Sequence, residues 1–234
     1  MTQISIARSE RVELVVSPWR WRFAEARRAE IDRHFAALKQ RKPAVWNGRM
    51  LMLHRHICDR SVFQGECFET DYASFIAWRD WGFPDQSALI CFGMGALRGS
   101  DGAFLLGVMA QHTVNAGGVY FPAGMLDPID VVGGAVGLAG NVAREVAEET
   151  GLVPGDYEAE AGWYTVFAGP RIAQIQVLRA SEPAAALRSR ALAHLARTRE
   201  SELADVRIVA GLPDLDPMMP PHVTAFLKHV FGGA

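Results

Sequence analysis

The sequence predicts an α+β fold in which a mixed β-sheet lies between layers of helices, an α/β/α sandwich. Two observations lead to this prediction. Strand-like segments and segments with helical spacing are interspersed along the chain. A single acidic helix near residues 141–150 interrupts the strands, and two amphipathic helices over 183–197 and 220–231 close the chain. Elements in this order pack as a sheet covered by helices.

The first 87 residues are expected to form an N-terminal α/β extension that packs on a core domain of residues 88–234. A helix is predicted over 24–39, where Ile31, Phe35 and Leu38 recur at helical spacing. A second, aromatic-rich helix is predicted over 72–81. The predicted strands of the extension are 12–16, 49–58 and 61–70, of which the last two form a hairpin.

The core domain is expected to contribute the main sheet. Its predicted strands are 88–97, 103–110, 157–168, 172–179 and 206–209. Residues 111–119 are polar and contain glycine, so we expect a loop close to a substrate. Residues 125–140 are expected to form a flexible loop that leads into the acidic helix. Its glycines do not indicate a phosphate-binding loop, because neither G-K-[ST] nor G-x-G-x-x-G spacing is present.

The acidic helix has a charge pattern that needs an explanation. Glu145, Glu148 and Glu149 stand at i, i+3 and i+4, so their carboxylates share one helix face. Like charges at this spacing oppose an isolated helix by about 0.2–0.5 kcal/mol per pair. A divalent cation would convert that repulsion into coordination, and hard carboxylate oxygens suit Mg²⁺. Val142 and Val146 give the same helix an apolar face to bury.

The ends of this helix are also predicted from sequence. Gly151 is well placed to adopt the left-handed conformation that terminates a helix. Asn141, or Gly140 before it, is expected to cap the N-terminus.

Residues 144–152 read Arg-Glu-Val-Ala-Glu-Glu-Thr-Gly-Leu, which resembles the second half of the Nudix box, R-E-U-x-E-E-x-G-U, at every fixed position. Upstream, Phe121-Pro122-Ala123-Gly124 resembles the F-P-x-G approach to that box. Gly124 and Asp130 supply G-x5-D where the family has G-x5-E. Thirteen residues, in place of the usual seven, separate Asp130 from Arg144. The chain is therefore identified as a member of the Nudix superfamily with an insertion of six residues inside the box.

The resemblance implies a Nudix fold and a hydrolase that cleaves a pyrophosphate bond in a nucleoside diphosphate linked to another moiety. It implies Mg²⁺ or Mn²⁺ as cofactor, held by Glu145, Glu148, Glu149 and the Gly124 carbonyl. Arg144 is expected to pair with Asp130 and orient the helix. The long extension and the long box loop loosely resemble nucleotide-sugar Nudix proteins, but the substrate is not determined by the sequence.

Catalytic roles are expected for Glu145, Glu149 and Arg144. The general base that activates water remains open between Glu145 and an acid from a downstream loop. Glu202 is the downstream candidate that we favour, Glu200 is the other local candidate, and Glu182 ranks behind both. His112 and Phe121 lie near the box and are the expected substrate contacts.

An alternative is a Nudix-fold nucleotide-binding or regulatory module with little catalysis. An RNA pyrophosphatase is less favoured, because the net charge is −2 and no basic track is visible. We therefore expect a small-molecule partner, no nucleic acid and no membrane; a homodimer stays open. Three cysteines without metal-ligand spacing, and no apolar leader, favour a cytoplasmic location.

Overall fold

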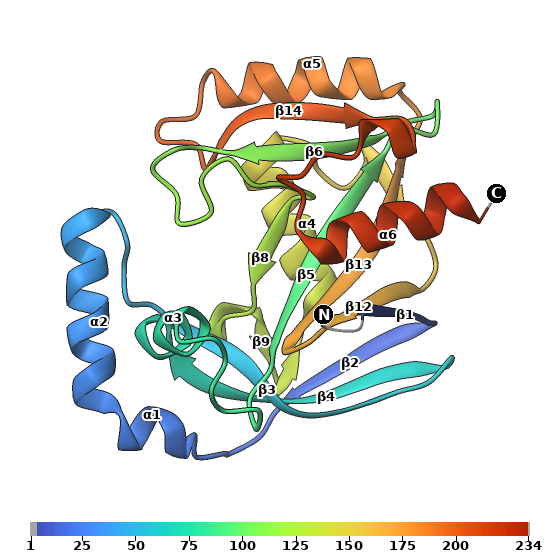
Figure 1. Ribbon diagram of the computed structural model, residues 1–234. Coiled ribbons are helices and arrows are strands. Elements are labelled where there is room, and N and C mark those ends of the chain that lie inside the picture. Colours follow the sequence, from blue (N-terminus) through green and yellow to red (C-terminus); the bar gives the residue numbers. More distant parts are fainter. Residues whose placement is uncertain (1–3, 234) are drawn as a thin grey trace.

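The computed structural model of the protein describes residues 4–233, and it contains two mixed β-sheets flanked by helices (Figure 1). The main sheet has the strand order β1-β12-β13-β5-β6-β14, with β11 on β13, β8 on β5 and β7 on β6. Its strands are β1 (Ile4–Ser9), β5 (Ile90–Arg98), β6 (Phe104–Met109), β7 (Val119–Tyr120), β8 (Ala123–Met125), β11 (Tyr157–Ala159), β12 (Trp163–Ala168), β13 (Arg171–Ala180) and β14 (Leu203–Val209).

A second sheet has the order β3-β4-β2-β10-β9. Strand β2 runs parallel to β4, and the other pairs are antiparallel. Its strands are β2 (Arg11–Val16), β3 (Arg49–Cys58), β4 (Val62–Asp71), β9 (Val131–Val132) and β10 (Ala135–Val136). The predicted hairpin of the extension is present as β3 and β4.

Helices cover both faces of the main sheet, so the predicted sandwich of helices around a mixed sheet is confirmed. Helices α4 and α5 share one apolar core with residues of β5 and β13, whereas α6 contributes to a separate core on the opposite face. Helix α3 packs against α2 and the second sheet. The helices are α1 (Arg22–Ala26), α2 (Arg28–Arg41), α3 (Tyr72–Asp80), α4 (Leu138–Thr150), α5 (Ala184–Leu195) and α6 (Pro221–Gly232).

Two glycines of β5 allow the acidic helix to lie close to the main sheet. A Cβ atom at Gly93 would lie 2.7 Å from a methyl carbon of Val142, and one at Gly95 would lie 2.4 Å from a methyl carbon of Val146. These distances are shorter than any normal carbon contact. The valines predicted to form the apolar face of the helix are therefore the side chains that pack onto β5.

One element was missed by sequence reasoning, and two predicted elements differ from the structure. The strand β1 was not predicted, although it pairs with β12 along its whole length. The helix expected over 24–39 is two helices that meet at Arg27. The single strand expected over 157–168 is broken into β11 and β12, with Gly162 at φ 84 between them.

The expected flexible loop at 125–140 is mostly regular structure. After β8 and a short 3-10 turn (Pro128–Asp130), residues 131–136 form a two-stranded hairpin of β9 and β10. Its two turn residues, Gly133 and Gly134, have φ angles of 59° and 85°, as a tight hairpin with positive φ at both central positions requires. β10 then pairs with β2 through Ala135–Val15 and Val136–Leu14.

Two strand pairings cross the predicted domain boundary at residue 87. β1 of the extension belongs to the main sheet, and β10 of the core belongs to the second sheet. The division into 1–87 and 88–234 stays a prediction. The extension and the core share one apolar cluster, in which Leu14 and Phe63 lie with Leu138 and Val142.

Candidate active site

The site is built where the main sheet splits. β5 and β6 pair at Arg98–Phe104 and then diverge. β8 lines the inner edge of β5 through Gly93–Gly124, and β7 lines the inner edge of β6 through Gly107–Tyr120. The Phe121-Pro122 segment crosses the split, held by a 2.9 Å hydrogen bond from the Gly95 N–H to the Pro122 carbonyl. The Phe-Pro-Ala-Gly segment is thus placed beside the acidic helix.

Helix α4 presents its three glutamates as the spacing predicts. It ends at Gly151, which has φ 71 and donates its N–H to Ala147, as expected. Its N-terminus differs from the prediction: the helix begins at Leu138 after Gly137, so Asn141 lies inside the helix. The buried Asn141 amide instead donates 2.9 Å to Asp130 Oδ2 and 3.3 Å to the Met125 carbonyl.

The three carboxylates differ in burial. The side chain of Glu145 is 15% exposed and that of Glu148 is 61% exposed. Glu149 is buried, and its Oε2 atom has no hydrogen-bond partner among residues 4–233. A buried carboxylate oxygen without a partner is costly in free energy, so this arrangement leaves a ligand position unsatisfied.

Gly124 lies directly against Glu145. A Cβ atom at position 124 would lie 2.1 Å from the carboxyl carbon of Glu145 and 2.2 Å from its Oε1. Only glycine therefore permits the Glu145 carboxyl group to reach the backbone of β8. This contact brings together the two groups that the resemblance assigns to a metal, the Glu145 carboxylate and the backbone of Gly124.

Arg144 links the first and second halves of the box. Its Nη2 lies 3.3 Å from Asp130 Oδ1, and its Nη1 lies 2.7 Å from Glu145 Oε1 and 3.6 Å from Glu148 Oε2. The expected Arg144–Asp130 pair is present despite the insertion. The Gly137 N–H donates to the Asp130 carbonyl at 2.8 Å, so the hairpin 131–136 is looped out and the chain resumes beside Asp130.

Two of the glutamates hold their protons unusually well. Burial raises the pKa of Glu145 to about 7, aided by the charges of Glu148 and Glu202, although Arg144 opposes the shift. Burial also raises the pKa of Glu149 well above its usual value, again with Glu145 and Glu202. The backbone of Ala123 acts in the opposite direction. The positive charge of Arg144 therefore does not balance the negative charges of the glutamates around it.

A divalent ion fits this chemistry in part. The donors are carboxylate oxygens and a backbone carbonyl, which suit Mg²⁺ or Mn²⁺. The unpartnered Glu149 oxygen and the crowding of like charges both favour a cation. Over residues 4–233, however, no three acidic, histidine or cysteine side chains converge as a ready-made metal centre. Arg144 holds Glu145 and Glu148, so metal binding there requires these ion pairs to rearrange.

The predicted general base Glu202 reaches the same site from another element. It is exposed at the start of β14, and its charge raises the pKa values of Glu145, Glu149 and Tyr120. Glu182 is engaged elsewhere, because its Oε1 lies 2.6 Å from Arg190 Nη1. Glu200 adopts a left-handed conformation with φ 58 in the turn before β14. Among these acids, only Glu202 has a charge that acts on the α4 carboxylates.

Two tyrosines were missed by sequence reasoning. Burial raises the pKa of Tyr120 to about 12, with Glu149 and Glu202 contributing. Burial likewise raises the pKa of Tyr72 on α3, where Glu202 is a minor contributor. Tyr120 directly precedes the Phe-Pro segment, which was a usable signal. Tyr72 lies far away in sequence and appeared only as one of several aromatic residues.

The two expected substrate contacts lie in different environments. His112 is exposed in the turn after β6, so its predicted role stays open. Phe121 is fully buried, with its ring centroid 5.7 Å from that of Phe104 and 5.6 Å from that of Phe226. The prediction of a Phe121 substrate contact is corrected: this ring fills the core beneath the site because its side chain points to the α6 face of the sheet.

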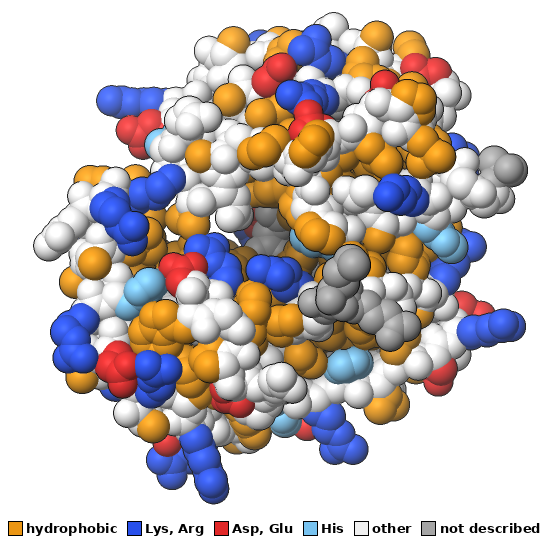
Figure 2. All heavy atoms as spheres, in the orientation of Figure 1, with side chains coloured by type: hydrophobic (Ala, Val, Ile, Leu, Met, Phe, Trp, Pro, Cys, Tyr) orange, Lys and Arg blue, Asp and Glu red, His pale blue; other side chains and the backbone are white. Residues whose placement is uncertain are grey.

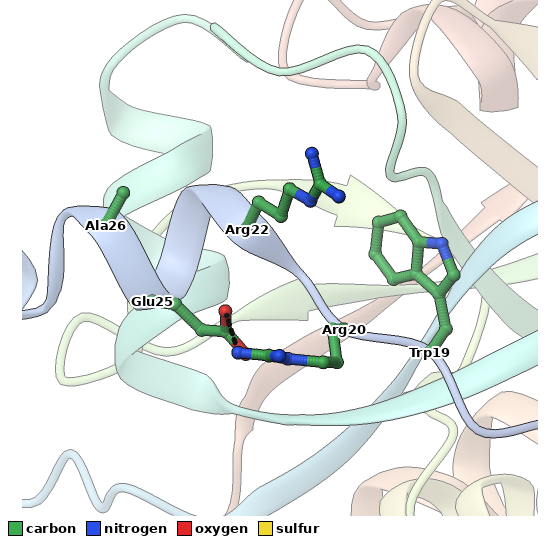
Figure 3. Close-up of a pocket in the computed structure, with 5 residues that line it drawn as sticks. All are labelled: Trp19, Arg20, Arg22, Glu25 and Ala26. Atoms are coloured by element: carbon green, nitrogen blue, oxygen red, sulfur yellow. Dashed lines mark hydrogen bonds and ion pairs between the residues drawn. The ribbon is translucent and has the colours of Figure 1, made fainter.

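Two surface pockets lie apart from the acidic helix. Figure 3 shows one on the extension, where Arg20 pairs with Glu25 at 2.9 Å beside Trp19 and Arg22. Another lies between β1, the β3–β4 turn and residues 161–162. Neither is lined by a residue of α4. A hollow in the middle of the face in Figure 2 is bordered by Lys and Arg side chains.

Comparison with known proteins gives a consistent but distant similarity. No protein-family model matches the chain, and no curated protein matches it. Similar solved structures include a MutT protein from Methanosarcina mazei Go1, with 21% identity, a TM-score of 0.39, and coverage of 60% of this chain and 91% of that one. A Nudix hydrolase from M. smegmatis, RenU, has 17% identity, a TM-score of 0.39 and coverage of 61% and 82%.

A Nudix hydrolase from Nitrosomonas europaea is similar at 16% identity and a TM-score of 0.39, over 62% of this chain and 90% of that one. TM-scores below 0.5 leave the activity to be inferred from the chain's own residues. Those residues define a mixed-sheet α/β/α protein with a Nudix-like acidic helix. None of the helices within 4–233 is long and apolar enough to cross a membrane.

Proposed function

We propose that this chain is a Nudix hydrolase that uses a divalent metal to cleave the pyrophosphate bond of a nucleoside diphosphate linked to another moiety, such as a nucleotide sugar. The observation that carries the proposal is the contact between Glu145 and Gly124, where any Cβ atom would lie 2.1 Å from the carboxyl carbon. Beside it lies Glu149, with a buried oxygen that has no partner within the described chain.

The residues around the split sheet have roles in this reaction. Glu145, Glu148, Glu149 and the Gly124 carbonyl would hold Mg²⁺ or Mn²⁺, which when bound offsets phosphate charge and polarises the phosphorus centre. Arg144 would hold the helix to Asp130 through its ion pair. The structure leaves Glu148 the most exposed of the three and thus the most accessible to solvent and substrate.

The proposed chemistry is hydrolysis of an anhydride. Water attacks one phosphorus, a new P–O bond forms, the anhydride P–O bond breaks, and the departing phosphate keeps the electron pair. The proton of the water passes to a carboxylate. Glu145 and Glu202 are the two candidates for that base, since Glu145 is partly buried at the site and the charge of the exposed Glu202 acts on it.

The test measures cleavage with Mg²⁺ or Mn²⁺ over a panel of nucleotide sugars, ADP-ribose, dinucleoside polyphosphates, coenzyme A and NADH. Each cleavage yields two phosphorylated products, which are followed by chromatography or by the phosphate that an added phosphatase frees from them. Wild type is compared with the double variant Glu148→Gln plus Glu149→Gln. Glu158→Gln, which alters an exposed glutamate on β11, is the matched control. We expect at least one substrate to be hydrolysed by wild type and the control, and at least 100-fold more slowly by the double variant. Equal rates for all three proteins would refute the catalytic assignment.

One observation favours the alternative, a nucleotide-binding or regulatory module. Arg144 occupies the space between Glu145 and Glu148 at 2.7 and 3.6 Å, and could neutralise the cluster without metal. Under that alternative, nucleotides bind with no turnover, and Mg²⁺ does not change the affinity. Calorimetric titration with and without Mg²⁺ separates the two functions.

A further inference from the structure

Arg171 is a half-buried cation without an acidic partner. It begins β13, where its backbone pairs with Ile90 of β5. Alternation along the strand puts its side chain on the same face as Ala173 and Ile175, which pack in the core that contains α6. None of the ion pairs formed within residues 4–233 includes it. Its guanidinium carbon lies 4.6 Å from the centroid of the Phe83 ring, a cation–π contact. Burial and the nearby charge of Arg79 both lower the pKa of Arg171.

His222 lies close enough to Arg171 for the charge of the guanidinium to act on its ring. It is 8% exposed at the N-terminal turn of α6, and its ring lies edge-on to Phe92 at 5.4 Å between centroids. Burial, with Arg171 as a second cause, lowers the pKa of His222 to about 4. At neutral pH the imidazole is therefore uncharged and can donate one N–H. The first turn of α6 contains no acidic residue, and its dipole is positive at this end.

Arg79 makes the surroundings of Arg171 more positive, although it is itself paired. Its Nη2 lies 2.7 Å from Asp80 Oδ1, and Asp80 also bonds His34. The nearest other acid on this loop, Asp85, accepts hydrogen bonds from Trp21 and Ser87. The acids around the pair are thus already engaged, and the charge of Arg171 is left uncompensated.

Phe83 is held in a strained conformation that positions the guanidinium. Its φ is 60°, a left-handed value that is uncommon for an aromatic residue. The Phe83 N–H donates to the Trp78 carbonyl at 2.9 Å, and the two rings meet edge-on with centroids 4.7 Å apart. Strain of this kind costs on the order of 1–3 kcal/mol and concentrates at ligand sites. The contact with Phe83 thus fixes Arg171 before any ligand arrives.

The pair lies within reach of a molecule bound at the acidic helix. Phe92 and Met125 are cross-strand partners, both partly exposed on the face that carries Arg171, and Met125 directly follows Gly124. Arg171 is three residues along the strands and two strands across from Gly124. This offset is roughly 14 Å between backbones, from about 3.3 Å per residue and 4.8 Å per strand. That span matches a diphosphate and one attached sugar or nucleoside.

We propose that Arg171 and His222 form an anion-binding subsite for the far end of the substrate, so that the preferred substrate is a diphosphate with a further phosphate or carboxylate group on one of its two moieties. The inference rests on the proposed function for the position of the diphosphate. Arg171 supplies the charge and His222 one hydrogen bond, across the floor made by Phe92 and Met125. A neutral moiety leaves the guanidinium half-buried and unpaired, which costs free energy.

The test uses two matched pairs of ligands that differ by one anionic group. UDP-glucuronate and UDP-glucose differ by a carboxylate, and ADP-ribose 2′-phosphate and ADP-ribose differ by a phosphate. Calorimetric Kd values are measured for the whole chain without divalent metal. The variants are Arg171→Gln, Arg171→Lys, which retains the charge, and Arg33→Gln, which alters an exposed arginine of α2 as the matched control. Melting curves confirm that each variant is folded.

We expect wild type to bind the charged member of at least one pair about ten-fold or more tightly than the neutral member. Arg171→Gln should abolish that preference, Arg171→Lys should retain part of it, and Arg33→Gln should leave it unchanged. Equal affinity for both members of both pairs, a preference that survives Arg171→Gln, or no binding of any charged member overturns the subsite.

Turnover is measured separately with Mg²⁺. A charge preference in binding without hydrolysis of any ligand would contradict the proposed enzyme and leave the subsite standing. Hydrolysis of neutral and charged members at equal kcat/KM, with no preference in binding, would leave the enzyme standing and remove the subsite. The two proposals therefore fail in distinguishable ways.

Discussion

Arg144 Nη2 lies 3.3 Å from Asp130 Oδ1, although thirteen residues separate the two in sequence. The pair is possible because the hairpin 131–136 leaves and rejoins the box at adjacent points, the Asp130 carbonyl and the Gly137 N–H, 2.8 Å apart. Asp130 is 9% exposed and also accepts from Asn141. A shorter acid than the family's glutamate is therefore long enough here.

Replacing Asp130 should disturb the helix orientation and thus the reaction. In Asp130→Asn the charge partner of Arg144 is lost while the size is kept. We expect a drop of about 10–100-fold in kcat/KM and a destabilisation of roughly 1–3 kcal/mol, because a buried charged hydrogen bond is lost. Asp130→Glu, which retains the charge, should be less impaired. Equal activity of Asp130→Asn and wild type would contradict an orienting role for the pair.

Deleting residues 131–136 tests whether the insertion is separable from the site. The deletion joins Asp130 to Gly137 and restores seven residues before Arg144. We expect measurable hydrolysis with an unchanged metal requirement. The melting temperature should fall, because the Val136 side chain leaves the core and β2 loses its partner β10. Loss of activity in a variant that is still folded would show that the hairpin itself serves the site.

Gly124→Ala should displace Glu145, since the added Cβ atom would overlap the carboxyl group. We expect a loss of activity of about 100-fold or more, because a misplaced ligand or base removes transition-state stabilisation. Gly140→Ala is the matched control. Gly140 lies on α4, the helix that carries Glu145, and no atom lies within 4 Å of its Cβ position. That control should have wild-type activity, and its free energy of unfolding should be about 0.5–1 kcal/mol higher than that of wild type. A fully active Gly124→Ala protein would refute the close contact.

Glu149→Gln should stabilise the metal-free protein at neutral pH. The pKa of Glu149 is raised in the folded state, so the carboxylate binds its proton more tightly when folded than when unfolded. Stability from this group is present below the unfolded pKa and is lost as pH rises toward the folded pKa. The variant should therefore melt at a higher temperature than wild type in EDTA at pH 8. Mg²⁺ should raise the melting temperature of wild type but not of the variant.

The lowered pKa of His222 predicts the opposite pH dependence of stability, with a loss of stability in acid. Its folded pKa of about 4 lies below the ordinary histidine value of 6.5, so the unfolded state binds more protons between these values. Stability from this group is present above pH 6.5 and is lost as pH falls toward 4. The whole effect is on the order of 3 kcal/mol for a group this buried. Urea unfolding of wild type and His222→Gln between pH 4 and 7 measures it; identical pH slopes would contradict the buried neutral histidine.

Local patterns in the sequence were sufficient for most elements and for the acidic helix. Hydrophobic periodicity depends only on neighbours along the chain, and it predicted the strand at 49–58 and the helices at 72–81 and 220–231, which the structure contains. The same is true of the spacing that places Glu145, Glu148 and Glu149 on one helix. The Arg144–Asp130 pair followed from the resemblance alone.

Partners distant in sequence could not be found in the same way. The pairing of β1 with β12 joins residues more than 150 apart, and no local pattern encodes it. The hairpin at 131–136 was interpreted as a loop because its glycines suggest flexibility, whereas β2 supplies the partner that orders it. The Phe121 prediction was wrong for a related reason: its position beside the motif gave no indication of the face to which its ring points.

β1 of the extension pairs in the main sheet and β10 of the core pairs in the second sheet. This arrangement affects how the chain folds and which truncated forms are stable. β1 pairs with β12, a strand that is synthesised much later than β1. The outer edge of β12 therefore stays unpaired until residues 163–168 have been made and β1 has added to them. A fragment starting at residue 88 would expose that edge of β12 and leave β10 paired with β9 alone. Such truncated forms should self-associate, whereas the intact chain closes both gaps with its own strands.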